Sequence, residues 1–351
     1  MDNRSGTLSI GLDPGFGSVK AVLLGPQGPQ IAAVLSVVGV GETDLGLLSL
    51  GSLGRRRRTS EPDKVAFQGI TYLVGDDVAR YARPVERMDF LRLSDGPELR
   101  ALVYDVLFRL LGEGEHKIDV MLGLPVEVMA DGEQARTTLR ALRHWMIGRH
   151  VYAVNGAEEM LTVVDVQAMA QPAGAFFAWG LNDAGRWIRA RVDLKAPVAV
   201  CDVGFNTLDL FSVQGGEVIG RFTSGDTAGM RRAAELIVSA VRGSHGLSLS
   251  LQEADALLRA KRPSLYTAEG EADLGRLVRQ ALDMTAAAVV SYVERRWGNG
   301  RQFPHLLFTG GGAEALRRAL LEQYPHGLVL PDPVTANALG LARYAARTFK
   351  E

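Results

Sequence analysis

The chain has 351 residues, of which 47% are hydrophobic and 23% are charged, and its formal net charge at pH 7 is −1. These values are typical of a globular chain of about two domains, and the near-zero charge argues against a generally cationic surface for nucleic acid. The single cysteine, Cys201, excludes an intramolecular disulfide, and its place inside an apolar run favours a small buried side chain over a nucleophile.

The first residues show no secretory signal, because Asp2 precedes the first apolar run and Asp13 interrupts it. The most apolar longer stretch, residues 31–53, contains Glu42 and Asp44 and is rich in glycine, which argues against a membrane span. The lone cysteine adds a preference for a reducing compartment. We therefore expect a cytoplasmic protein without membrane insertion.

Residues 8–24, LSIGLDPGFGSVKAVLL, predict a β-hairpin in which one apolar strand ends at Asp13 and a second begins at Val19. Glycines in its loop allow the backbone to point N–H groups at an anion, and Asp13 could hold a hydrated Mg²⁺. The alternative is a tight turn whose aspartate accepts hydrogen bonds from turn amides. The residues expected to contact a polyphosphate in this loop are Gly15, Phe16, Gly17, Ser18 and Lys20.

A strand is predicted at residues 30–38, followed by a long Gly- and Ser-rich loop at 39–64. This loop contains Arg55 to Arg58, which is either a solvated charge run or a contact with an acidic partner, a neighbouring subunit or DNA phosphates. The other elements predicted in the first half are two short strands joined near Gly69, a helix starting before residue 83, a helix at 98–111, a buried strand at 116–128 ended by Gly123-Leu124-Pro125, a helix at 133–147, and two short strands at 150–166 around Asn155-Gly156.

Residues 167–181 predict a strand that ends near Gln171 and a helix whose first turn accommodates Pro172. Gln171 would then project from the strand end toward the space between two domains, or it would satisfy N–H groups at the helix start. A polar connection follows at 182–195, and we expect the second domain to begin at Ala196.

Residues 198–213, VAVCDVGFNTLDLFSV, repeat the hairpin pattern, and both copies read D-x-G-F-x-[ST]. Internal repetition of this kind indicates two similar domains. Two loops, each led by a carboxylate, could bind one phosphate chain and its cation from both sides. The residues of the second loop in this hypothesis are Asp202, Gly204, Phe205, Asn206 and Thr207.

Helical periodicity in the second half predicts a helix beginning near Thr227 or Gly229 and two more at 251–261 and 274–297. The last residues predict a Pro-bounded loop and a C-terminal helix with Thr335 as its N-cap.

Residues 304–323 predict a short apolar strand, three successive glycines and one amphipathic helix. Gly310, Gly311 and Gly312 would let a base or ribose lie against bare backbone at a helix start. A simple strand-to-helix connection would give the same pattern.

The three motifs resemble the phosphate-1, phosphate-2 and adenosine motifs of the actin, sugar kinase and heat-shock chaperone superfamily, and the resemblance covers nearly the whole chain. Within it, GLPV at 123–126, TGGGAE at 309–314 and ANALG at 336–340 look most like the prokaryotic actin-like ATPases, the group of ParM and the archaeal actin-like proteins. The loops depart from the commonest patterns at Pro14 and Asn206.

The resemblance implies an α/β fold, the actin-like ATPase fold, with two ribonuclease H-like α/β domains around a nucleotide cleft. The domains would comprise residues 1–185 and 196–334, with a helix at about 335–351 packing back on the first. It also implies polymerisation into filaments, which in plasmid-borne relatives move DNA through a DNA-binding adaptor protein, and a cytoskeletal or DNA-segregating role.

As an ATPase of this family, the chain would hydrolyse ATP (or GTP) to ADP and phosphate with Mg²⁺, which Asp13 and Asp202 would hold through waters. Gln171 would orient the attacking water, and Gln167 is the alternative in a shifted alignment. The resemblance further implies phosphate contacts from Lys20, Ser18, Asn206 and Thr207, and nucleotide contacts from Gly310 to Gly312 and Asn337.

Two other functions use the same fold. The chain could be a nucleotide-dependent switch that does not polymerise, which electron microscopy of nucleotide-bound protein would reveal. It could also be a small-molecule kinase, whose ATP turnover would depend strictly on an added acceptor. A Rossmann dehydrogenase is disfavoured because no G-x-G-x-x-G opens a helix after a strand.

Overall fold

The structure, a computed structural model, describes residues 6–41, 61–85 and 96–349. The chain divides into two compact units: unit 1 comprises residues 1–124, 128–187 and 338–351, and unit 2 comprises residues 125–127 and 188–337. Arg55 to Arg58 lie outside the described residues, whereas both ends of the loop predicted at 39–64 fall in strands, β4 (Val38–Val40) and β5 (Asp63–Phe67). No helix among the described residues is both long and apolar enough to cross a bilayer.

Unit 1 contains a mixed sheet in the order β3-β2-β1-β7-β9-β8-β5-β6-β4, in which β7 pairs in parallel with both β1 and β9. Its strands are β1 (Leu8–Pro14), β2 (Ser18–Gly25), β3 (Gly28–Leu35), β4 (Val38–Val40), β5 (Asp63–Phe67), β6 (Ile70–Val74), β7 (Glu115–Leu124), β8 (Gly148–Val154) and β9 (Ala157–Ala170). Its helices are α1 (Val78–Tyr81), α3 (Pro97–Leu111), α4 (Val126–Ala130), α5 (Gly132–Met146), α6 (Gln171–Gly180) and α13 (Ala336–Thr348), of which the first residues of α4 and α13 belong to unit 2.

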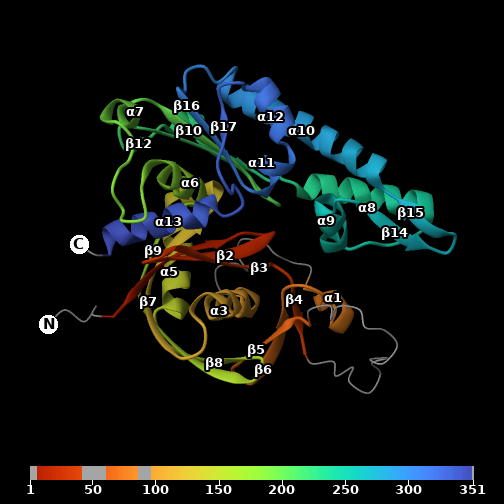
Figure 1. Ribbon diagram of the computed structural model, residues 1–351, viewed down its shortest axis with the longest axis horizontal. Helices are drawn as coiled ribbons and strands as arrows, with labels where there is room; N and C mark the ends of the chain where they lie inside the picture. The colour runs from red at the N-terminus through yellow and green to blue at the C-terminus, as the bar shows by residue number, and fades with distance from the viewer. Residues whose placement is uncertain (1–5, 42–60, 86–95, 350–351) are drawn as a thin grey trace. The chain divides into compact units, whose positions relative to one another are not determined.

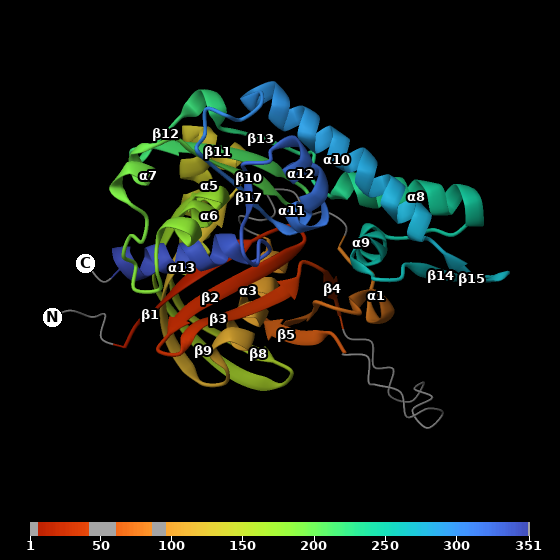
Figure 2. The ribbon, with the colours of Figure 1, turned by 45° about the horizontal axis from the view of Figure 1, so that its top comes forward.

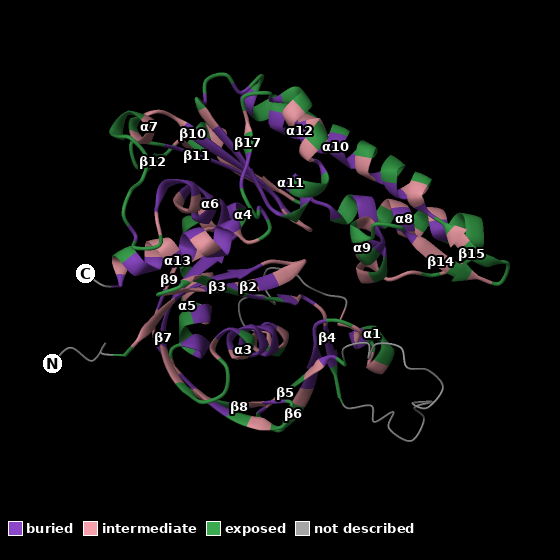
Figure 3. Cartoon of the chain, in the orientation of Figure 1, coloured by how far each residue is buried: buried purple, intermediate pink, exposed green. Residues whose placement is uncertain are grey.

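Helix α3 fills the concave side of this sheet, whose strands β7, β8, β5, β6 and β4 curve around it (Figure 1). Burial colours show that most of α3 is covered (Figure 3). The sequence periodicity explains this, because the six apolar residues at helical spacing are all buried. They are Leu99, Leu102, Val103, Val106, Leu107 and Leu110.

On the other side of the first hairpin, α13 lies along β1 and β2 (Figure 2). The approach is close because two glycines leave room for backbone. A Cβ at Gly11 would meet the backbone of Ala338 and Ala342, and one at Gly340 would meet the backbone of Gly174 in α6. The C-terminal helix is thereby packed against both β1 and α6.

Unit 2 contains a sheet in the order β12-β11-β10-β16-β17, with β13 paired to β11. Its elements are α7 (Arg191–Lys195), β10 (Val198–Val203), β11 (Leu208–Gln214), β12 (Glu217–Val218), the 3₁₀ helix η1 (Gly220–Phe222), β13 (Ser224–Asp226), α8 (Arg231–His245), α9 (Leu251–Arg259), β14 (Ser264–Thr267), β15 (Gly270–Asp273), α10 (Gly275–Trp297), β16 (His305–Thr309), α11 (Gly311–Ala315), α12 (Arg317–Gln323) and β17 (Leu328–Val329). Helices α8, α10 and α12 belong to one continuous core with β10 and β16.

The two sheets repeat one topology. In unit 1, β1 pairs antiparallel with β2, β2 pairs antiparallel with β3, and the parallel strands β7 and β9 extend the other side of β1. In unit 2, β10, β11, β12, β16 and β17 occupy the same five positions with the same directions. The repeat predicted from two short sequence motifs therefore extends over five strands of each sheet.

Most predicted elements are confirmed, and several differ in their limits. The buried strand predicted at 116–128 ends at Leu124 and is followed by α4, and the polar connection predicted at 182–195 contains α7. The strand predicted at 30–38 is interrupted at Ser36, and the second strand predicted at 150–166 continues to Ala170. The helix predicted near Thr227 or Gly229 begins at Arg231, and the helix predicted after the three glycines is broken at Leu316 into α11 and α12.

The predicted N-cap role of Thr335 is not observed. Its hydroxyl donates a hydrogen bond to the Asp332 carbonyl oxygen (3.2 Å) and so faces back into the loop before α13.

Candidate functional site

The loop of the first hairpin is closed by hydrogen bonds from its own backbone and from Ser36. The Gly15 N–H donates to the Ser18 carbonyl oxygen (3.2 Å) across the loop. Ser36 donates its N–H to the Gly17 carbonyl (3.1 Å) and its hydroxyl to the Gly15 carbonyl (2.6 Å). Ser36 itself is buried, so the loop is fixed from within the unit.

Asp13, in β1 just before this loop, brings three predicted residues together. Its Oδ2 atom lies 3.1 Å from Lys20 Nζ, and its Oδ1 atom accepts a hydrogen bond from Gln171 Nε2 at 2.8 Å. Both Asp13 and Gln171 are buried. Gly123, near the end of β7, leaves room for them, since a Cβ there would lie 3.0 Å from Gln171 Cγ. We call Asp13, Lys20, Gly123 and Gln171 the first half-site.

The second hairpin has the same closure. The Gly204 N–H donates to the Thr207 carbonyl oxygen at 2.9 Å, as Gly15 does to Ser18. Asp202 is buried in β10, and its Oδ2 atom accepts a hydrogen bond from Asn337 Nδ2 at 2.6 Å. A Cβ at Gly310, which follows β16, would meet the Asp202 carboxylate.

The topology explains why these contacts match. Gln171 begins the helix after β9, and Asn337 lies in the first turn of the helix that follows β17, which is the equivalent strand. Gly123 and Gly310 likewise lie at the ends of the equivalent strands β7 and β16. Each unit therefore places an aspartate, a carboxamide donor and a glycine at the ends of the same three parallel strands, where α/β proteins commonly bind ligands.

The half-sites differ at one position of the hairpin. In β2, Lys20 is the cross-strand partner of Asp13, whereas in β11 Asp209 is the cross-strand partner of Asp202. The Asp209 side chain is fully buried, and its Oδ1 atom accepts the Val126 N–H at 3.1 Å. Burial, followed by the nearby charge of Asp202, raises the pKa of Asp209 to about 8. We call Asp202, Asp209, Gly310 and Asn337 the second half-site.

The second half-site suits a hard cation better than the first. Its Asp209 Oδ2 and Asn337 Oδ1 atoms are buried and have no hydrogen-bond partner among the described residues. Mg²⁺ prefers oxygen ligands and usually takes only one or two carboxylates, with waters and phosphate oxygens completing its shell. In the first half-site, Lys20 already balances the charge of Asp13.

A metal site made by the chain alone is not present in the described residues, where no cluster of three or more His, Cys, Asp or Glu side chains could hold an ion. The second half-site would therefore bind Mg²⁺ together with a ligand that supplies further oxygens.

The three glycines after β16 have different surroundings. A Cβ at Gly310 would meet Asp202 and the Val203 carbonyl, and a Cβ at Gly312 would meet Val203 and Met230. These two glycines are required by packing within unit 2. Only Gly311 faces open space and could lie against a base or ribose as predicted for all three.

The second loop is tied to the start of α8. The Met230 N–H donates to the Gly204 carbonyl (3.0 Å), and the Arg231 N–H donates to the Phe205 carbonyl (2.6 Å). Gly229 lets the chains approach, since a Cβ there would lie 2.5 Å from the Phe205 carbonyl oxygen. These bonds explain why α8 begins at Arg231 and not near Thr227.

Sequence reasoning missed Ser36 and Asp209. Extending the alignment of the two copies by two residues would have matched Asp209 with Lys20, but the buried position of the Asp209 carboxyl could not be seen in the sequence. Ser36 carries no motif, because its role depends on how β3 returns beside the loop. Of the two glutamines considered, Gln171 contacts Asp13, while Gln167 lies within β9 with its Nε2 atom 3.4 Å from Asp165.

Two family models match the chain in separate halves. Residues 11–174 match the N-terminal domain of actin-like proteins, and residues 200–322 match the C-terminal domain of an archaeal actin homologue described as MreB-like. No curated protein matches the sequence at a significant level.

Solved structures share the fold over nearly the whole chain. A 15-stranded ParM filament from Clostridium botulinum is 17% identical with a TM-score of 0.75, covering 97% of this chain and 99% of that chain. Ta0583, an archaeal actin homolog in complex with ADP, is 16% identical with a TM-score of 0.72, covering 97% and 100%. An Alp12 filament structure is 14% identical with a TM-score of 0.59, covering 98% and 99%. Likeness at these identities establishes the fold alone.

Proposed function

We propose that this chain, which belongs to the actin-like proteins, binds ATP or GTP with Mg²⁺, hydrolyses it and assembles into filaments. The observation that carries the proposal is the repeated half-site. Two hairpin loops have the same backbone closure, and each is led by a buried aspartate that accepts a hydrogen bond from a carboxamide. One such loop is a common turn, whereas two matched loops in a duplicated fold indicate a shared ligand.

The chemistry of the half-sites suggests a division of roles on one nucleotide. The N–H groups and hydroxyls of the two loops, including Ser18 and Thr207, would bind phosphate oxygens, and Lys20 would add a positive charge. Asp202, with Asp13, would hold Mg²⁺ through waters, and a bound cation would favour the ionised form of Asp209, which would then add a negative charge beside it. When bound, Mg²⁺ would neutralise charge on the phosphates.

Gln171 is the candidate that orients the attacking water. Its amide already has one fixed contact, to Asp13, so its second polar atom could hold a water in a defined direction. Such positioning is the main task of a protein in phosphoryl transfer. Gly311 and Asn337 would lie on the nucleoside side of the ligand.

Self-association is supported by relatives of this fold that form filaments, namely the ParM and Alp12 assemblies. By extension, we propose a cytoplasmic cytoskeletal or DNA-segregating role in which an adaptor protein links the filament to DNA.

Sedimentation of the purified protein tests the proposal. With Mg²⁺ and ATP or GTP, protein above a critical concentration should move to the pellet, and with EDTA it should stay in the supernatant. Asp202→Asn should abolish pelleting, whereas Asp283→Asn on the exposed face of α10 should leave it unchanged. A supernatant that never loses protein at high concentration with either nucleotide would refute filament assembly.

A further inference from the structure

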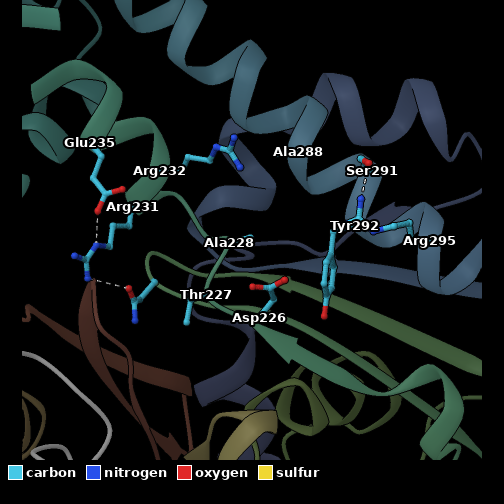
Figure 4. A pocket seen from close by; sticks show the side chains of 11 residues that line it. Asp226, Thr227, Ala228, Arg231, Arg232, Glu235, Ala288, Ser291, Tyr292 and Arg295 are labelled. Atoms are coloured by element: carbon cyan, nitrogen blue, oxygen red, sulfur yellow. Dashed lines mark hydrogen bonds and ion pairs between the residues drawn. The ribbon is translucent and has the colours of Figure 1, made fainter. Parts of the chain in front are cut away.

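Unit 2 contains a pocket of about 780 Å³ between α8, α10 and the end of β13, which shares only Asn206 with the residues assigned to the nucleotide (Figure 4). Its volume lies in the range that binds small molecules. Its walls come from α8 through Arg231, Arg232 and Glu235, and from α10 through Ser291, Tyr292 and Arg295. Asp226, the last residue of β13, and Thr227 line a third side, and Asn206 of the second hairpin loop also lines the pocket.

Not all of the arginines that line this pocket form ion pairs with described residues. Arg231 is bound to Glu235 (2.8 Å) and lies 3.5 Å from the Asn206 amide oxygen. Arg295 contacts Ser291 (2.8 Å) and forms no ion pair with a described residue. The guanidinium of Arg232 has neither a hydrogen bond nor an ion pair to any described residue, and Figure 4 shows it extending from α8 into the space before α10.

Asp226 supplies a carboxylate on the same pocket without neutralising these arginines. Its side chain is half-buried and makes no hydrogen bond or ion pair within the described part of the chain. Opposite charges that line one pocket but do not pair leave room for a ligand that bridges them. Such a ligand needs an anionic group for the arginines and a hydrogen-bond donor for the carboxylate.

The aromatic wall of the pocket is held by hydrogen bonds. Tyr292 is buried, and its hydroxyl is held by the Gly225 carbonyl (3.3 Å) and Ser224 Oγ (3.1 Å). Arg295 lies over its ring, 5.7 Å from the centroid. The guanidinium is therefore positioned by a cation–π contact and by Ser291 before any ligand arrives, which lowers the entropic cost of binding.

From this arrangement we infer that the pocket binds a hydroxylated phosphate monoester. With three arginines against Asp226 and Glu235, the lining carries a formal excess of one positive charge, which favours a net anion over a zwitterion. Two guanidiniums on different helices suit the three terminal oxygens of a phosphate, since a planar carboxylate pairs with one guanidinium face. Hydroxyl groups of the ester would donate to Asp226. This site goes beyond the proposed nucleotide function and does not depend on it.

Calorimetric titration tests the inference with glycerol 3-phosphate as the probe and with inorganic phosphate and glycerol as comparisons. The wild-type protein should bind glycerol 3-phosphate, and Arg232→Gln should weaken binding about tenfold or more, as expected for a charge-assisted hydrogen bond. Arg232 is exposed, so this variant should fold. Arg242→Gln, an exposed arginine at the other end of α8, is the matched control and should keep the wild-type affinity.

The comparison ligands separate two sources of the phosphate group. If the pocket takes an ester, Asp226→Asn weakens glycerol 3-phosphate and not inorganic phosphate; equal binding of both anions by the wild type would assign the site to free phosphate.

Three results would overturn the inference: binding of glycerol as strong as that of its phosphate, no binding of either anion, or an affinity unchanged in Arg232→Gln. Loss of binding in a Ser18→Ala/Thr207→Ala variant without loss in Arg232→Gln would place the probe on the hairpin loops instead.

Discussion

Asp209 is a buried carboxyl whose pKa of about 8 lies well above the value of 3.8 for a free aspartate. Between these two values the folded protein keeps a proton that the unfolded chain releases, so the free energy of unfolding falls as pH rises, and it levels off above about pH 8. The slope from this group is about 1 kcal/mol per pH unit. Asp209→Asn should remove this slope, so the free energy of unfolding of the variant, relative to that of wild type, should rise as the pH increases from 5 to 8. Urea unfolding without Mg²⁺ measures the difference.

A control for this experiment is Asp283→Asn, because that side chain is exposed on α10 and should not alter the slope. Parallel pH profiles for wild type and Asp209→Asn would contradict the buried, protonated state of Asp209. Adding Mg²⁺ and nucleotide should reduce the difference at neutral pH, since a bound cation favours the ionised carboxylate.

Gln171 donates a hydrogen bond to Asp13, so it could either orient the attacking water or only hold Asp13 in place. If it orients water, Gln171→Ala should lower ATP turnover about a hundredfold while the Kd for Mg·ADP changes little. If it only positions Asp13, both turnover and Mg·ADP binding should weaken together. We expect the first result, measured by phosphate release and by fluorescence titration. Gln167→Ala, three residues before the end of β9, should behave like wild type in both assays.

At the scale of elements, glycines set where α13 can pack. A Cβ at Gly340 would overlap the backbone of Gly174 in α6, and the same helix α13 lies against Gly11 of β1 at Ala338 and Ala342, so it has no room to move away. Gly340→Ala should therefore lower the free energy of unfolding by about 1–3 kcal/mol or more, as overpacking in a dense interior does. Thermal or urea unfolding measures the change.

Gly243→Ala is the matched control for Gly340→Ala. Gly243 lies in the last turn of α8 with no atom near its Cβ position, so the same substitution should stabilise the protein by about 0.5–1 kcal/mol through helix propensity. Equal effects of the two substitutions would mean that the contact between α13 and α6 is not tight.

The sequence predicted elements where local pattern decides them and failed where distant contacts do. The α3 periodicity and both hairpins could be read directly, because apolar spacing and turn glycines are local signals. The start of α8 could not, since Met230 and Arg231 bond to the second loop, which lies more than twenty residues earlier. The break at Leu316 also escaped, because that residue is buried with apolar partners on a helix that otherwise reads as continuous.

In the candidate site, too, residues marked by a local motif could be predicted and residues defined by distant contacts could not. Asp13, Asp202 and Gln171 were predicted from motif and strand ends, and the structure gives each a buried position with a hydrogen-bond partner. Asp209 was missed because its importance comes from burial and from its place opposite Asp202, neither of which is visible in a run that reads as an ordinary strand.

For the whole molecule, the repeat offers a way to divide one function between two similar units. Five strands of each sheet share one order, and the ends of three of them carry the same side-chain types. The change from Lys20 to Asp209 replaces a cationic side chain with a carboxyl at the equivalent position, and a bound cation would favour the ionised form of that carboxyl. Duplication followed by this charge difference would produce one half-site suited to phosphate and another suited to a cation.

This division predicts how the whole chain responds to its ligand. Mg·ADP at about a hundred times its Kd should raise the free energy of unfolding by about 2.7 kcal/mol, because it binds only the folded state. Asp13→Asn and Asp202→Asn should each reduce that gain, and Asp202→Asn should also remove the difference between Mg·ADP and ADP with EDTA, because the cation lies with the second half-site. Thermal unfolding with each ligand measures both effects. Two variants with the same Mg²⁺ dependence as wild type would show that the cation binds elsewhere.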